Sequence, residues 1–360
     1  MTPTATPEFR LIAECCGLYG RASPEFTERS LPVLDWNRFL RLARFHRVQG
    51  LVWEALAPRA AHIPADVSQS LAADAADIAA DNLRAAVECA ALQDEFAAAG
   101  VPLLFIKGLT VGALAYRRSS IKSASDIDLL IPDCELDRST GLLRQRGYVP
   151  VIPQGASSSA LRRWHRVRKE SLWAKVGPSL EVDLHTRLAD SRRLIPGIGI
   201  GSPLQIVEVA RGIELPTLGN DELFAYLAVH GASSAWFRLK WITDLAALVA
   251  RHPAAEIERL YRRSQELGAG RAAAQALLLA DRLFDALAEV PDLGRELRAD
   301  RTSRWLARTA FRQLAARPDP VEPTSAPLGT AAIHATQFLL LPGAAFKASE
   351  LVRQIRYHFA

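Results

Sequence analysis

Cysteine is scarce in this chain of 360 residues, and the few cysteines form no recognisable framework. There are four of them, Cys15, Cys16, Cys89 and Cys134. An adjacent pair is a poor disulfide candidate, and the spacing of all four lacks the pattern of a metal site. The sequence therefore excludes a disulfide-stabilised secreted domain and a cysteine-ligated metal centre, and it suits a reducing cytoplasm.

Long hydrophobic runs and a strong excess of one charge are also missing. The apolar stretches are shorter than a membrane span, and residues 1–8 lack the basic and then apolar pattern of a signal peptide. Lysine and arginine (44) exceed aspartate and glutamate (39) only slightly, for a net charge of +5. We therefore expect a cytoplasmic protein without a membrane partner. Its charge fits a polyanionic ligand such as a nucleotide but is too small to require nucleic acid.

Two carboxylates stand two residues apart at the head of the apolar run Asp126-Ile127-Asp128-Leu129-Leu130-Ile131. The run predicts a strand, and because side chains alternate along a strand, Asp126 and Asp128 share one face. Carboxylates about 7 Å apart along a strand repel each other unless a cation lies between them, and oxygen ligands of this kind suit Mg²⁺. The pair indicates metal-assisted chemistry on a phosphorylated substrate, with a solvated strand end as the structural alternative.

A strand and a glycine turn precede this pair. Residues 101–106 read as a buried strand, and they run into Lys107-Gly108 and the start of a helix over 109–114. A strand that ends in a glycine turn at a helix N-terminus presents free backbone N–H groups. We expect phosphate to be held there, with Lys107 adding a positive charge. Glycine at such a turn also has a purely steric explanation.

A hairpin supplies a third carboxylate. The residues on either side of Gly177-Pro178 have strand character, so this dipeptide predicts the turn. In the second strand Glu181, Asp183 and His185 share one face. If this strand lies beside the one with the aspartate pair, Asp183 completes a three-carboxylate site able to hold two metal ions, or one metal and an activated hydroxyl. The alternative is the polar face of a half-solvated strand.

The order of these motifs resembles the nucleotidyltransferase fold shared by polymerase β, aminoglycoside nucleotidyltransferases and minimal nucleotidyltransferases. More narrowly, it resembles an uncharacterised bacterial nucleotidyltransferase family, whose members carry Lys-Gly at the turn and often sit in lasso-peptide, other natural-product or polysaccharide gene clusters. The resemblance covers roughly residues 99–188. Two positions depart from the family pattern: Lys122 stands where many members have arginine, and Thr186 stands where the Asp-Leu-His motif continues with tryptophan.

The resemblance implies an α+β fold in which helical regions flank a small mixed sheet. We predict an N-terminal helical region at 1–98, a nucleotidyltransferase core at 99–190 and a C-terminal helical region at 191–360. Periodicity supports the helical flanks, including an alanine-rich amphipathic segment from about 64 to 99. In the C-terminal region Asn220 is a candidate N-cap, residues 316–323 are proline-rich and predict a loop, and the apolar segment 338–346 is expected to dock on the body or a partner.

The implied reaction is transfer of a nucleoside monophosphate, AMP from ATP, to a hydroxyl or phosphate of a peptide or small-molecule acceptor. The catalytic and metal-binding residues would be Asp126, Asp128 and Asp183, with two Mg²⁺ ions and with Asp183 also as general base. The residues expected to hold the triphosphate are Lys107, Gly108, Lys122, His230, Arg238 and Lys240. Lys240 also has a purely structural interpretation, because it is spaced to pair with Asp244 along a helix. Trp236 and Trp241, in the same segment, can likewise be core residues.

Two other functions stay open on the same residues. The scaffold can move the γ-phosphoryl group instead, as a phosphotransferase, or it can bind a nucleotide or a partner without turnover. The densest cationic run, Leu161–Lys169, predicts either contact with an acidic acceptor or a nucleic-acid backbone, or a solvated edge anchored by Trp164. The loop predicted before it, over 154–159, is a candidate for acceptor recognition.

Overall fold

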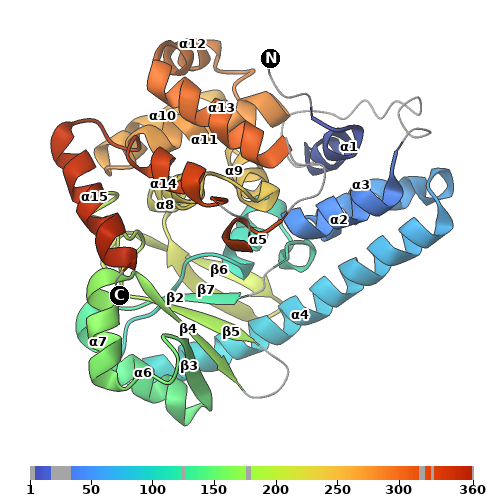
Figure 1. The fold of residues 1–360 in the computed structure, drawn as a ribbon. Coiled ribbons are helices and arrows are strands. Elements are labelled where there is room, and N and C mark those ends of the chain that lie inside the picture. The colour runs from blue at the N-terminus through green and yellow to red at the C-terminus, as the bar shows by residue number, and fades with distance from the viewer. Residues whose placement is uncertain are drawn as a thin grey trace.

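The computed structural model describes residues 5–17, 34–123, 126–175, 180–315, 321–325 and 328–358. Figure 1 shows a helical body stacked on a sheet, with the long helix α4 crossing the molecule beside them. The N-terminal helices are α1 (Pro7–Cys16), α2 (Trp36–His46), α3 (Gln49–Leu56) and α4 (Ala65–Ala98). The sheet region contains β1 (Leu104–Phe105), α5 (Leu109–Tyr116), β2 (Asp126–Leu130), α6 (Leu136–Gln145), β3 (Tyr148–Ile152), α7 (Ser158–Val167), β4 (Glu170–Lys175) and β5 (Glu181–His185).

The remaining elements are β6 (Leu204–Ala210), β7 (Ile213–Leu218), α8 (Asn220–Ser233), α9 (Leu239–Ala250), α10 (Ala254–Glu266), α11 (Arg271–Phe284), α12 (Pro291–Ala299), α13 (Arg301–Ala315), α14 (Ala331–Gln337) and α15 (Ala344–His358). Short 3-10 helices occur at Ala57–His62, Ser119–Ile121, Asp133–Glu135 and Pro323–Ser325. The predicted α+β class is confirmed. The boundaries predicted after residues 98 and 190 stay predictions.

Local sequence accounts for several helix ends. The carboxylate of Asp35 caps α2 by accepting a hydrogen bond of 2.9 Å from the backbone N–H of Arg38. Helix α4 occupies almost the whole alanine-rich segment predicted from about 64 to 99. The predicted N-cap of α8 is wrong by one residue, because Gly219 holds that position. Asn220 lies inside the first turn, where its side-chain oxygen accepts a hydrogen bond of 3.0 Å from Gln205.

The five strands of the main sheet follow the order β1-β2-β5-β4-β3. Strands β2 and β5 are parallel and the other neighbours are antiparallel, so the sheet is mixed, as predicted. The β4-β5 hairpin is also confirmed, although its predicted turn at Gly177-Pro178 lies outside the described residues. The strand predicted over 101–106 is only two residues long. Proline at position 102 has no N–H for a ladder, which limits extension of β1 toward the N-terminus.

The central strands sort their side chains to opposite faces of the sheet. On one face, Ile127 and Leu129 of β2 and Val182 and Leu184 of β5 join a buried cluster with α4 and α6, which includes Phe96. Because side chains alternate along a strand, the carboxylates of the same two strands lie on the other face. That face is turned toward the helical body. The sheet therefore has one apolar, helix-covered face and one polar face that can form a site.

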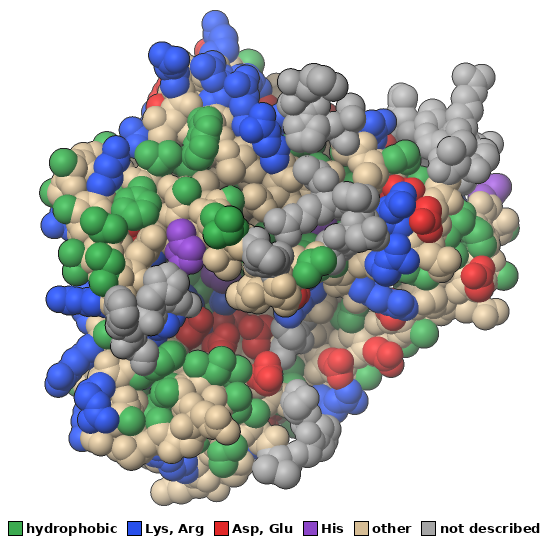
Figure 2. All heavy atoms as spheres, in the orientation of Figure 1, with side chains coloured by type: hydrophobic (Ala, Val, Ile, Leu, Met, Phe, Trp, Pro, Cys, Tyr) green, Lys and Arg blue, Asp and Glu red, His purple; other side chains and the backbone are tan. Residues whose placement is uncertain are grey.

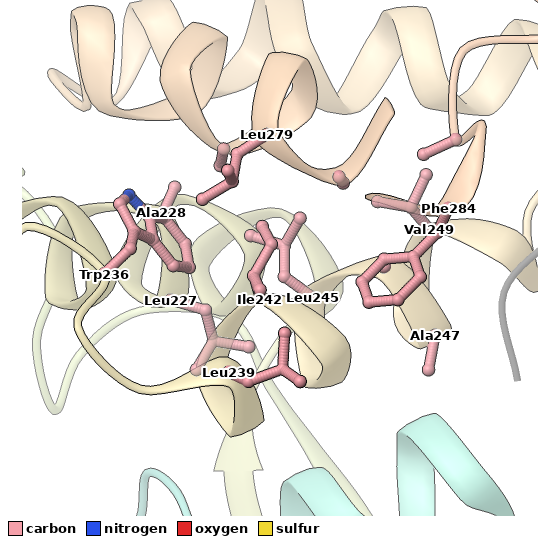
Figure 3. Packing of buried hydrophobic residues seen from close by; sticks show 14 of the residues in the cluster. Leu227, Ala228, Trp236, Leu239, Ile242, Leu245, Ala247, Val249, Leu279 and Phe284 are labelled. Atoms are coloured by element: carbon pink, nitrogen blue, oxygen red, sulfur yellow. The ribbon is translucent and has the colours of Figure 1, made fainter. Parts of the chain in front are cut away.

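The helical body has its own apolar core, which Figure 3 shows between α8, α9 and α11. Trp236, Leu239 and Leu245 are fully buried there against Leu279. The indole of Trp236 packs on Gly231 so closely that a Cβ atom at that glycine would lie 2.3 Å from the ring. The reading of Trp236 as a core residue is thus confirmed.

A β-hairpin interrupts the region predicted as helical from residue 191. Strands β6 and β7 pair antiparallel around Gly212, which has φ of +74°. Leu204 and Ile206 of β6 are exposed while Val207 is buried, so apolar and polar residues do not alternate along this strand. Strand β7 contains Pro216, a residue that usually argues against a strand. These features explain why the sequence pattern did not predict the hairpin.

Further predictions concern the cationic run, two loops and the apolar segment near the C-terminus. The cationic run lies on α7 and the turn after it, where Leu161 and His165 are buried and the indole N–H of Trp164 donates to the carbonyl of Glu170. The loop predicted over 154–159 is shorter, because α7 begins at Ser158. The apolar segment 338–346 docks on the helical body through Leu340, which is fully buried. Of the proline-rich loop, residues 316–320 lie outside the described residues. Within the part of the chain that the structure describes, no helix is long and apolar enough to cross a membrane.

Candidate active site

The predicted aspartates meet at the centre of the sheet. In the parallel register of β2 and β5, Asp128 is the direct partner of Asp183 and Asp126 is the partner of Glu181. Asp126, Asp128 and Asp183 line one cavity of about 320 Å³. The sequence prediction that Asp183 lies beside the aspartate pair is therefore correct in its geometry. Figure 2 shows acidic side chains gathered in a hollow between the helices and the sheet.

Lys107 and Gly108 lie at the edge of the same cavity. The ammonium of Lys107 is 2.7 Å from Oδ1 of Asp128. Gly108 is the N-cap of α5 with φ of +65°, a backbone conformation that favours glycine, and the first N–H groups of that helix follow it. The strand, turn and helix predicted around these two residues are confirmed as elements.

The charges around Asp128 explain why its side chain stays deprotonated. Burial alone would raise the pKa of Asp128, but the Lys107 ammonium and a hydrogen bond with Nε2 of His185, 3.0 Å long, hold that pKa well below its usual range. Burial acts on Lys107 in the opposite sense, and the Asp128 carboxylate raises the pKa of Lys107 well above its usual value. Asp128 is thus a carboxylate and Lys107 an ammonium at neutral pH.

Asp183 is compensated less well, because the Lys107 ammonium is outweighed by burial and by neighbouring carboxylates. Burial first, and then the carboxylates of Asp128, Glu170 and Asp126, raise the pKa of Asp183 to about 8. A concentration of buried negative charge of this kind is what a bound cation would relieve. Ligand atoms of Asp128, Asp183 and His185 lie within 4.8 Å of one another. The donor set of carboxylate oxygens and an imidazole therefore fits a divalent cation. His185 takes the place in this trio that the sequence prediction gave to Asp126.

Lys169 and Glu170 are among the site residues that the sequence reasoning missed. Glu170 stands opposite His185 in the β4-β5 register, and its Oε2 is 3.2 Å from Nδ1 of His185, although the two atoms are not aligned for a hydrogen bond. Burial alone would raise the pKa of Glu170, but the neighbouring ammonium of Lys169 and the His185 ring lower it to about 2. Both Lys169 and Glu170 line the cavity. The available signal was the hairpin itself, because its register places Glu170 on the face of Asp183.

The predicted triphosphate residues all lie in the wall of this cavity. From the helical body these are His230, Arg238 and Lys240, and from the loop before β2 it is Lys122. Burial, and then Lys107 and Lys169, lower the pKa of His230 well below its usual value, so its imidazole is neutral. Burial and the charge of Lys122 lower the pKa of Lys240 to about 7. Lys240 is therefore a cation whose charge is easily changed near neutral pH.

The pairing expected between Lys240 and Asp244 is replaced by a longer-range one. Asp244 accepts a hydrogen bond of 2.7 Å from the hydroxyl of Tyr116, and its other oxygen is 3.4 Å from the ammonium of Lys122. Lys122 is thus held by a carboxylate of the helical body. Arg238 is also fixed, because it contacts the carbonyl of Phe45 and the carboxylate of Glu322 and stacks over the Phe45 ring.

The cavity as a whole combines six basic and six acidic side chains. The basic ones are Arg47, Lys107, Lys122, Lys169, Arg238 and Lys240, and the acidic ones are Asp126, Asp128, Glu170, Asp183, Asp244 and Glu322. Such an arrangement can hold a cation on the sheet and a highly charged anion between the cation and the basic wall.

Comparison with known proteins agrees with this chemistry. Residues 32–285, well over half of the chain, match the family model described as "Uncharacterised nucleotidyltransferase". No curated protein matches the chain. The matched range includes every residue that lines the cavity except Glu322.

Proposed function

Because the chain belongs to the uncharacterised nucleotidyltransferase family, we propose that it transfers a nucleoside monophosphate, AMP from Mg²⁺-ATP, to a hydroxyl or phosphate group of a peptide or small-molecule acceptor. The family is one of nucleotidyltransferases and implies a nucleoside triphosphate and a divalent metal. The choice of ATP, of Mg²⁺ and of the acceptor belongs to our proposal, as does a part in natural-product biosynthesis.

One observation carries the proposal. Asp128 and Asp183 face each other on neighbouring parallel strands, and Lys107 and Gly108 stand at the adjoining helix N-terminus. Carboxylates bind the cation and backbone N–H groups bind phosphate oxygens, so a metal–triphosphate complex satisfies both halves of the cavity at once. A site for an uncharged substrate would not need six basic side chains in the same cavity as the carboxylates of Asp126, Asp128 and Asp183.

We assign roles to the residues as follows. Asp126, Asp128 and Asp183 would hold Mg²⁺, which when bound screens the triphosphate charge and makes the α-phosphorus more open to attack. Lys107 and the N–H groups at Gly108 would neutralise phosphate oxygens, with Lys122, Arg238 and Lys240 on the opposite wall. His230 is neutral and would act as a hydrogen-bonding group beside them.

The proposed reaction is a single displacement at the α-phosphorus. The acceptor oxygen forms a bond to that phosphorus, the bond to the bridging oxygen of the β-phosphate breaks, and pyrophosphate leaves. Asp183 would take the acceptor's proton, since it lines the cavity beside Asp128. The product is a nucleotidylated acceptor.

The test combines binding and product analysis. Calorimetric titration of ATP, GTP, CTP and UTP, with and without Mg²⁺, should show metal-dependent binding of one nucleotide to the wild type and its loss in Asp126→Asn. With an accepted substrate, label from [α-³²P]ATP should enter the product and label from [γ-³²P]ATP should leave as pyrophosphate. Incorporation of γ-label would show a phosphotransferase instead. Binding without turnover across a broad acceptor screen would show a binding module.

A further inference from the structure

Two further cavities continue from the candidate active site along the molecule. The second cavity, about 540 Å³, shares Lys169, Glu170 and His230 with the first. The third, about 430 Å³, shares Asp190, Ser191 and Arg353 with the second. The three cavities therefore lie one after another in space, and together they provide more room than a nucleotide alone requires.

The third cavity is dominated by arginine, and we refer to it as the arginine groove. It lies between the end of α7, the loop after β5 and helix α15. Its lining includes six arginines, Arg166, Arg187, Arg192, Arg193, Arg353 and Arg356, but among the described lining residues a single carboxylate, that of Asp190. In the view of Figure 2 basic side chains gather at the left edge, around α7 and α15.

Within the described part of the chain, four of these guanidinium groups, those of Arg166, Arg192, Arg193 and Arg356, form no ion pair. Arg353 has its own partner, because it makes a two-pronged ion pair with the buried carboxylate of Glu350, at 2.9 and 2.5 Å. Arg187 donates a hydrogen bond to the carbonyl of His165. Burial first, and then repulsion by Arg192, lower the pKa of Arg187, and the carboxylates of Asp190 and Asp133 oppose this only in part. Like charges that repel one another in a groove form a binding site for an anion, and planar guanidinium groups suit phosphate and carboxylate oxygens.

The second cavity has a different character. Most of its charges are paired, Lys169 with Glu170 and Arg353 with Glu350, and the remaining carboxylate, that of Asp190, accepts a hydrogen bond of 3.0 Å from the backbone N–H of Lys169. Its wall also carries five hydroxyl side chains, those of Ser191, Ser233, Ser234, Thr324 and Thr330, beside six apolar ones, those of Leu188, Ala189, Leu194, Val229, Ile333 and Leu340. An uncharged ligand that bears hydroxyl groups suits such a wall better than a charged one, because it exchanges hydrogen bonds without burying a further charge.

The order of the cavities defines the shape of a ligand. We propose that the acceptor is an elongated, hydroxyl-bearing molecule with a phosphate or carboxylate at its far end, held by the arginine groove. Its uncharged part occupies the second cavity, and its near hydroxyl reaches the aspartates. This inference rests on the proposed function, and it selects a hydroxyl over a phosphate as the acceptor group. Much of the wall comes from residues 324–356, which lie outside the range that matches the family model.

Calorimetry with a matched pair of probes tests the inference. The nucleotide site is first filled with Mg²⁺ and a non-hydrolysable ATP analogue, and then glucose 6-phosphate or glucose is titrated. Glucose 6-phosphate should bind, and glucose should bind more weakly by about tenfold or more. The exposed pair Arg192→Gln/Arg193→Gln should weaken glucose 6-phosphate by about tenfold or more and leave the affinity for the ATP analogue unchanged.

The matched control is Arg308→Gln/Arg312→Gln, which removes two exposed arginines from α13 and should leave both affinities unchanged. The inference is overturned if the wild type does not bind glucose 6-phosphate, or if the groove variant binds it as well as the wild type. It is also overturned if a single-stranded oligonucleotide binds more tightly than the sugar phosphate through the same arginines, since the groove would then serve nucleic acid. Failure of the wild type to bind the ATP analogue would instead count against the proposed function. Titration of glucose 6-phosphate alone would still show whether the arginine groove binds it.

Discussion

At the centre of the sheet, two neighbouring side chains of β2 that point to opposite faces are both hidden from water but are opposite in kind. Leu129 is fully buried and Asp128, its neighbour in β2, is only 3% exposed. Burial of the leucine stabilises the fold by about 1.5–3 kcal/mol. Burial of the carboxylate costs free energy, and the structure offsets it with Lys107 and His185. One face therefore contributes stability, and the other holds charge in place for chemistry.

The largest expected effect comes from removing a charge on the polar face without changing its shape. Asp183→Asn should lower the rate of nucleotidyl transfer by about 10³-fold or more, because the proposed reaction loses both a cation ligand and its base. The thermal midpoint should not fall, since the variant also relieves the repulsion that raises the pKa of Asp183. Steady-state kinetics and a thermal melt measure the two quantities. Asp292→Asn, at an exposed position on α12, is the control and should match the wild type. An Asp183→Asn enzyme with near-normal rates would remove Asp183 from the proposed site.

The neighbouring residue in β5 should behave in the opposite way. Leu184 is fully buried on the apolar face, so Leu184→Ala should lower the free energy of unfolding by about 2–5 kcal/mol. The rate per folded molecule should change little. Urea unfolding with activity measured well below the midpoint separates the two effects. The exposed Leu83→Ala on α4 should cost less than about 0.5 kcal/mol. A Leu184→Ala variant that stayed stable but lost its activity would contradict the division between the faces.

A feature of these two faces could be predicted from the sequence when the residues that determine it lie close together along the chain. The aspartate pair, the turn at Gly108 and the β4-β5 hairpin depend on a few adjacent residues, and their alternation and turn chemistry were enough to place them. Helix α4 was also predictable, because its periodicity extends over many turns. Each of these features carries its signal within its own segment.

The parts that were not predicted depend on contacts between distant segments. Asp244 looked like a partner of Lys240 on the same helix, but the fold brings Lys122 and Tyr116 to it from the sheet region. The β6-β7 hairpin was hidden because hydrophobic residues stand on both of its faces. The arginine groove joins α7, the loop after β5 and the C-terminal helix, and no local pattern relates those segments.

A moderate effect should come from the wall opposite the sheet. Lys240→Met should weaken Mg²⁺-ATP binding by about tenfold at pH 6.5, where Lys240 carries its charge, because one phosphate contact is lost. The pKa of Lys240 is lowered to about 7, so its charge is present below that pH and is lost above it. On binding Mg²⁺-ATP at pH 8, the wild type should therefore take up more protons, net of any that Asp183 releases to the cation, than Lys240→Met does, and calorimetry in buffers of different ionisation heat detects the difference. Equal proton exchange in the two proteins would assign the effect to another group, and Lys347→Met, at an exposed position, serves as the control.

The smallest effect should come from a charged residue on the helix-covered side of the sheet. It tests whether a charge destabilises the fold because of where it lies or because of the charges that surround it. Glu88 of α4 lies 2.7 Å from Arg146 and 2.6 Å from Lys175, and it accepts a hydrogen bond from Tyr148. Burial raises its pKa, but these partners together lower it to about 2. The stability that they contribute is thus present above about pH 4.5, the usual value for glutamate, and is lost as the pH falls toward 2. Glu88→Gln should cost about 1–2 kcal/mol at pH 7 and progressively less below pH 4.5.

Unfolding curves of wild type and Glu88→Gln between pH 7 and pH 3 measure this difference, with the exposed Glu266→Gln as the control. The rate of nucleotidyl transfer should be the same in all three proteins. Such a result would mean that a half-buried charge contributes to stability where partners of opposite charge surround it, and that Asp183 differs because most of its charged neighbours carry the same charge as itself. If the stability difference did not change with pH, the ion cluster would not be the cause of the cost, and packing of the Glu88 side chain would be.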